Sequence, residues 1–157
     1  MKRFGTMLLI SAVAIGTAGT SAQQNHAGHA HDRADVPAYN TAPPPKNAKL
    51  APILSGRQLS GPNFAHPAQV KSYKEAAKYA HVLHQLPCYC HCDRNAGHAS
   101  LRTCFESEHG AVCGTCMQEA LYAAEETRKG KTVKQIREAI IRGEHTKLDL
   151  RKITSAE

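Results

Sequence analysis

All six cysteines of this chain lie between Cys88 and Cys116. Three of them alternate with single residues in a Cys-x-Cys-x-Cys run at positions 88–92, and two more form a Cys-x-x-Cys pair at 113–116. Sulfur at this density either binds a soft metal ion or forms disulfides, and both outcomes tie together the segments that carry it. Any fold of this chain must therefore bring the run, Cys104 and the pair to one place.

The N-terminus has the features of an export signal. Residues 1–3 are Met-Lys-Arg, residues 7–15 are mostly apolar, and small residues follow at 20–22. This order is typical of a secretory signal peptide, and the apolar run is too short to span a membrane. We expect residues 1–22 to be removed by cleavage near Ala22, leaving a periplasmic or secreted chain without a membrane span. Disulfides persist in that compartment, so location alone does not choose between bridges and metal.

Composition divides the rest of the chain into three parts. Residues 23–50 are rich in Ala, Pro, Asn and His and have no helical or strand period, which predicts a disordered linker. Residues 51–143 form one cysteine-rich domain, in which short apolar pieces up to Phe64 lie over the core as a strap. Residues 144–157 form a charged C-terminal tail.

Several helices are expected in the domain. Pro67 suits the first position of a helix, and the apolar spacing continues to Leu86, where Pro87 stops it. The sequence also predicts a short helix over about residues 100–107 and a long one over roughly 112–129.

Glycine and capping residues mark the last two helix boundaries. Gly130 is placed to end the long helix in a left-handed conformation, and Thr132 with Gln135 forms a capping box for a final helix. The fold class is therefore all-α, a small bundle of about four helices with a cysteine-rich loop.

Metal and disulfide hypotheses both fit the cysteine spacing. Disulfides would have to pair each cysteine of the run with Cys104, Cys113 or Cys116, under restrictive geometry. A metal site has less restrictive geometry than three disulfides, because thiolates from one loop can converge on a common centre. Thiolates with imidazole suit Cu(I) and Zn(II), and the dense spacing favours Cu(I). Zinc would use four donors, whereas a multi-copper site could use all six sulfurs.

Three histidines stand among the cysteines, one inside the run, one after the Gly97 turn and one just before the Cys-x-x-Cys pair. Each either ligates or supports a metal, or is a surface or helix-capping imidazole. The predicted metal ligands are Cys88, Cys90, Cys92, Cys104, Cys113, Cys116, His91, His98 and His109.

Other functional classes find little support. Met117 follows the Cys-x-x-Cys pair where covalent haem attachment needs histidine, and no βαβ pattern surrounds the pair as in thioredoxins. Paired acids such as Glu125 and Glu126 look like solvated helix faces, so no hydrolytic machinery is visible. The net charge of +7 is spread out, with three Phe, five Tyr and no Trp, which gives no nucleic-acid surface. We expect a binding protein and not an enzyme.

The order of the motifs resembles a known family. The segments that carry the likeness are Gln85-Leu-Pro-Cys-Tyr-Cys-His-Cys92, Gly97-His98-x-Ser100-Leu101-x-x-Cys104-Phe105 and His109-Gly110-x-x-Cys113-x-x-Cys116-x-x-Glu119-Ala120. Together they are similar to the PCYCGC-motif family of small exported bacterial proteins, over residues 52–143. The resemblance implies an exported helical domain whose cysteines act together, and it brings no catalytic residues. This chain has His91 where the family has glycine, and it lacks the lipid-modified cysteine of many members.

These observations lead to one hypothesis and two alternatives. The leading hypothesis is an exported soft-metal-binding protein, with Cu(I) favoured over Zn(II), that serves storage, delivery or detoxification. Its expected partners are the metal ion and a metal-trafficking or thiol-redox protein. The alternatives are a disulfide-stapled helical interaction module without metal, and a thiol-redox partner.

Overall fold

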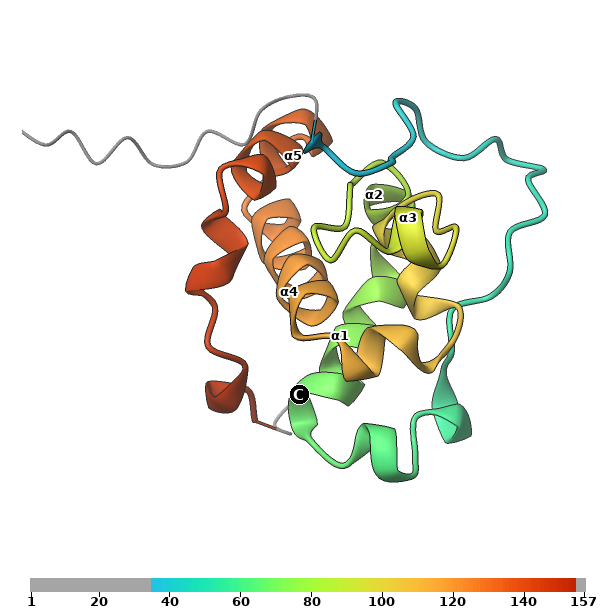
Figure 1. The fold of residues 1–157 in the computed structure, drawn as a ribbon, viewed down its shortest axis with the longest axis vertical. Coiled ribbons are helices and arrows are strands. Elements are labelled where there is room, and N and C mark those ends of the chain that lie inside the picture. The colour runs from blue at the N-terminus through green and yellow to red at the C-terminus, as the bar shows by residue number, and fades with distance from the viewer. Residues whose placement is uncertain (1–34, 155–157) are drawn as a thin grey trace, which may run out of the picture.

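The computed structural model describes residues 35–154, which fold into helices and contain no β-strand (Figure 1). The all-α prediction is confirmed. The predicted signal peptide and residues 23–34 of the linker lie outside the described range. The α-helices are α1 (Pro67–Lys78), α2 (Ala80–Leu83), α3 (Cys92–Asn95), α4 (Gly114–Arg128) and α5 (Val133–Ile141). The short 3-10 helices are η2 (Gly56–Gln58), η3 (Pro62–Phe64), η4 (Leu101–Phe105), η5 (Glu108–Val112), η6 (Glu144–Lys147) and η7 (Leu150–Lys152).

Helix α1 begins at Pro67 as predicted but ends before the predicted Leu86. At its start the His66 side chain accepts a hydrogen bond from the Ala68 N–H at 3.3 Å. At its end Tyr79 leaves the helical region, with φ −111° and ψ 28°. The chain then turns into the separate short α2, which buries Val82 and Leu83. The prediction of one continuous helix was wrong, because the chain leaves the helical conformation at Tyr79. The apolar residues that follow are buried from the separate helix α2.

The core lies where α1 packs against α4 (Figure 1). Tyr73 of α1 and Phe105 of η4 are fully buried, and their rings meet edge to face at 4.9 Å between centroids. The predicted strap packs over this core through partly buried side chains, and the Leu54 N–H donates to the Phe105 carbonyl at 3.0 Å. Phe64 is buried at the end of the strap. The strap therefore holds η4 in place from outside.

Helix α4 starts at Gly114, slightly later than predicted, because Cys113 is extended (φ −118°) and serves as its N-cap. Its end agrees with the prediction, since Gly130 has φ +80°. The capping box of Thr132 and Gln135 also forms at the start of α5. The predicted short helix over 100–107 is the 3-10 helix η4, followed by η5.

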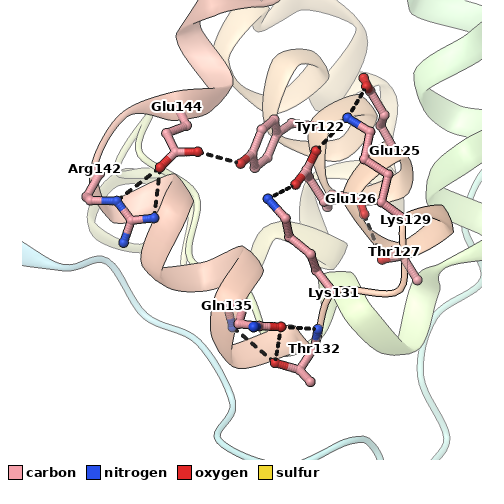
Figure 2. A network of polar contacts seen from close by, with 11 residues as sticks. Tyr122, Glu125, Glu126, Thr127, Lys129, Lys131, Thr132, Gln135, Arg142 and Glu144 are labelled. Carbon is pink, nitrogen blue, oxygen red and sulfur yellow. Dashed lines mark hydrogen bonds and ion pairs between the residues drawn. The ribbon is translucent and has the colours of Figure 1, made fainter.

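A polar network closes the C-terminal end of α4, opposite the end that carries Cys116 (Figure 2). Glu126 is only 4% exposed and forms ion pairs with Lys129, at 2.9 Å, and with Lys131. The network continues to η6, where the Tyr122 hydroxyl donates to Glu144 at 3.0 Å. The prediction that Glu126 lies on a solvated face was wrong, because the turn into α5 brings lysine side chains over it.

Residues on both sides of the domain also make contacts. In the segment predicted to be a linker, Asp35 pairs with Arg94 at 2.6 Å, and the Asn40 side chain donates to the His84 carbonyl at 3.0 Å. In the predicted tail, η6 and η7 contact α4, and Gln118 donates to the Leu148 carbonyl at 2.8 Å. Within residues 35–154, no helix has both the length and the apolar character needed to cross a membrane.

Candidate metal centre

The segment that carries the Cys-x-Cys-x-Cys run, residues 88–92, folds as a tight turn. The His91 N–H donates to the Cys88 carbonyl at 3.0 Å, and His91 itself is left-handed, with φ +54°. The Tyr89 N–H donates to the Glu119 carboxylate of α4 at 2.8 Å. This turn separates the three sulfurs, since the first two approach α4 while Cys92 opens α3 and faces η4.

The first group of donors, the three-thiol cluster, consists of Cys88, Cys90 and Cys116. The Sγ–Sγ distances are 3.3 Å from Cys88 to Cys90, 3.4 Å from Cys88 to Cys116 and 3.6 Å from Cys90 to Cys116. These distances exceed the S–S bond of about 2.05 Å, and all six cysteines are free. Cys88 and Cys116 are buried and Cys90 is half-buried, so the sulfur triangle is reached from the Cys90 side.

The second group, the Cys2His2 cluster, consists of Cys92, His98, Cys104 and His109, whose ligand atoms all lie within 4.8 Å of one another. The sulfurs of Cys92 and Cys104 are 3.3 Å apart, and His98 Nδ1 is 3.3 Å from the Cys104 sulfur. The His98 and His109 rings meet edge to face at 4.6 Å. The two clusters adjoin, because the Cys90 sulfur lies 4.0 Å from His109 Nε2.

Helix α1 positions the segment that supplies His109. The Tyr73 hydroxyl donates to the Ser107 carbonyl at 2.5 Å and accepts from the Ala111 N–H at 3.1 Å. Gly110 lies against η4, where a Cβ atom would come within 3.0 Å of both the Cys104 carbonyl and the Phe105 ring. A side chain at position 110 would therefore push η5 away from Cys104.

The structure brings seven of the nine predicted ligands into the two clusters and leaves two outside them. Cys113 is half-buried at the N-cap of α4, where its thiol interacts with Cys90 and Cys116 without belonging to either cluster. His91 belongs to neither cluster, and its Nε2 lies 3.9 Å from the Asp35 carboxylate. The nine residues predicted as one set thus lie in two compact groups with two neighbours.

Local electrostatics favour the metal-binding forms of Cys90, Cys92 and His98, whereas interactions with neighbouring thiols and burial raise the pKa values of Cys88, Cys104 and Cys116. Hydrogen bonds from Cys104, Cys113, Cys116 and Cys88 lower the pKa of Cys90, which favours a thiolate there. Burial and the neighbouring His109 lower the pKa of His98, which favours the neutral imidazole that metals require.

One residue near the clusters was not predicted as part of the site. Glu119 is fully buried one helical turn after Cys116, and burial raises the pKa of its carboxyl to about 8. It accepts from the Tyr89 N–H and interacts with the Cys88 thiol. The signal was present in the Cys116-x-x-Glu119 spacing, which places both side chains on one helix face. Glu119 therefore supports the turn that carries the first two sulfurs.

Comparison with known proteins gives one match. A family model described as "Protein of unknown function with PCYCGC motif" matches residues 6–147 of the chain. The match is wider than the expected 52–143 and includes both donor clusters. No curated protein and no solved structure matches the chain.

Proposed function

Because this chain belongs to the PCYCGC-motif family, whose function is unknown, we propose its function from its own geometry. The protein binds soft metal ions outside the cytoplasm, with Cu(I) preferred at the three-thiol cluster. It acts as a binding protein in storage, delivery or detoxification, and not as an enzyme. The signal-like N-terminus supports the location, and the donor set supports the metal.

The observation that carries this proposal is the near-equilateral triangle of the Cys88, Cys90 and Cys116 sulfurs, with sides of 3.3, 3.4 and 3.6 Å. An ion with metal–sulfur bonds of about 2.3 Å needs a triangle with sides of about 4 Å. The sulfurs therefore need to separate by only about half an ångström to hold one ion in their plane. Three thiolates without nitrogen or oxygen donors form a soft set, which favours Cu(I) over Zn(II).

The proposal is tested by titrating the reduced, metal-free chain with Cu(I) against a competing Cu(I) chelator. We expect sub-nanomolar binding, and each of Cys88→Ser, Cys90→Ser and Cys116→Ser should lower the Cu(I) stoichiometry. The control is His91→Gln, which changes a neighbouring side chain that belongs to neither cluster and should leave the stoichiometry unchanged. Binding weaker than micromolar, or serine variants with unchanged stoichiometry, would contradict the proposal.

A disulfide-stapled module is the second candidate, because two close sulfur pairs each join the loop to a helix. These are Cys92 with Cys104 at 3.3 Å and Cys88 with Cys116 at 3.4 Å. Intact mass spectrometry of protein from its native compartment separates the two functions. A chain that is four hydrogens light, or six if the remaining two cysteines also pair, and free of metal indicates the stapled module, whereas a reduced chain with bound metal indicates the metal-binding protein.

A further inference from the structure

We propose that the Cys2His2 cluster is a separate structural Zn(II) site, different in metal and role from the three-thiol cluster beside it. The inference deepens the proposed function and rests on it, since both sites use the same cysteine loop. Cys92, His98, Cys104 and His109 hold Zn(II) and stabilise the short elements of this face, while Cu(I) binds at the other three sulfurs.

The donor chemistry separates the two clusters. Two thiolates and two imidazoles are a common closed set for tetrahedral structural zinc. Two thiolate charges also balance Zn(II), so the filled site is neutral in surroundings where Cys92 and Cys104 are 3% and 0% exposed. The three-thiol cluster has no nitrogen donor of its own, which leaves it the softer site. In a single copper–thiolate cluster, the imidazoles of His98 and His109 would have no role as ligands.

The surrounding elements explain what a zinc ion would stabilise. Cys92 lies on α3, Cys104 on η4 and His109 on η5, and these helices contain only four, five and five residues. Such short helices are unstable alone, because one or two turns do not offset the cost of nucleation. His98 lies three residues after the end of α3, and its N–H donates to the Cys92 carbonyl at 3.3 Å. One ion would therefore hold together α3, η4 and η5, and through His98 the connection between α3 and η4.

Cobalt(II) is the probe for this site, because tetrahedral Co(II) with mixed sulfur and nitrogen ligands absorbs visibly and replaces zinc. The full-length reduced chain should bind one Co(II) with tetrahedral bands that one equivalent of Zn(II) removes. Zinc X-ray absorption should show two sulfurs and two nitrogens. His98→Gln should weaken Zn(II) binding by roughly tenfold or more, whereas His81→Gln, at an exposed position of α2, should leave it unchanged.

Paired variants distinguish failure of this inference from failure of the proposed function. Cys88→Ser with Cys90→Ser should abolish Cu(I) binding and keep the Co(II) bands, and Cys92→Ser should do the reverse. Because Cys92→Ser removes a buried group, circular dichroism must show that it keeps its helices, and His98→Gln provides the milder variant. The zinc inference is wrong if zinc has four sulfur ligands, or if both His98→Gln and Cys92→Ser leave Zn(II) affinity unchanged. Absence of Cu(I) binding with intact Co(II) bands would overturn only the copper proposal.

Discussion

At the scale of single residues, His91 has an unfavourable backbone conformation in the middle of the cysteine loop. It is the only residue other than glycine with positive φ in the range 35–154. A side chain in the left-handed region costs about 1 kcal/mol or more, and the family motif has glycine at this position. The ring lies 3.9 Å from the Asp35 carboxylate.

Replacing His91 with glycine should therefore be tolerated and even favourable. We expect His91→Gly to raise the free energy of unfolding by up to about 1 kcal/mol and to leave metal stoichiometry unchanged. Urea unfolding and metal titration measure the two quantities. Loss of one bound ion in this variant would show that His91 is a ligand after all.

Glu119 stabilises the cysteine loop, whereas His91 strains it. Its buried carboxyl accepts the hydrogen bond from the Tyr89 N–H. Glu119→Ala leaves the Tyr89 N–H without its acceptor, and we expect a loss of about 2 kcal/mol in unfolding free energy with weaker Cu(I) binding. Glu119→Gln keeps an oxygen acceptor and should lose much less in both measurements. Equal losses in the two variants would argue against this hydrogen bond as the cause.

At the scale of elements, the close approach of η4 and η5 determines whether His109 reaches the sulfurs. Gly110→Ala forces a Cβ against the Cys104 carbonyl and the Phe105 ring, and we expect it to cost about 1–3 kcal/mol and to weaken binding at the Cys2His2 cluster. Gly114→Ala is the matched control, because its nearest neighbour outside the helix is 3.9 Å away. Similar thermal stability and Zn(II) affinity in the two variants would contradict this account.

The α4–α5 junction carries a pH-dependent contribution to stability. Hydrogen bonds from Lys131 and Lys129 lower the pKa of Glu126, so its contribution is present above the pKa of the unfolded chain and is lost as pH falls through the folded value. Glu126→Gln should cost about 1 kcal/mol at pH 7, and the deficit should shrink as pH falls below about 4 and vanish only below the lowered pKa of the folded carboxyl. Glu125→Gln, at a half-exposed position, should cost little at either pH. A pH-independent deficit in Glu126→Gln would indicate packing as its origin.

Sequence reasoning was accurate for elements with strong local signals and failed where tertiary contacts decide. Pro67, Gly130 and the Thr132–Gln135 box mark boundaries through backbone geometry, and each lies where it was predicted. The break at Tyr79 and the burial of Glu126 depend on how the chain turns after each helix, which periodicity does not contain.

The division of the site into two clusters was not predicted for the same reason. Cysteine spacing shows that the sulfurs are close in sequence but does not show which helix each one faces.

At the scale of the whole molecule, two kinds of structure share one domain. Long helices pack through Tyr73, Ala120 and Ile136, which are fully buried, whereas most donors lie on turns and short helices. These apolar side chains belong to the hydrophobic core, so we expect the long helices to stay packed without metal. The donor-bearing elements join the same core through Leu101 and Phe105, but their turns and short helices also depend on whatever joins the sulfurs.

Metal removal should therefore loosen one face and leave most helix intact. A structural ion at about 1,000 times its Kd adds about 4 kcal/mol, so chelation under reducing conditions should lower Tm by about 10 °C or more. At about 20 °C, well below Tm, the metal-free protein should retain most of its helical circular dichroism signal. An unchanged Tm would show that neither cluster stabilises the fold.

The five-residue turn at 88–92 belongs to both clusters, because its first two sulfurs meet α4 while its last faces η4. An ion that fixes either end of so short a segment restricts the other end as well. If both clusters bind ions as proposed, filling one should lower the entropy cost of ordering the other. Thermodynamic linkage then requires each ion to favour the other equally.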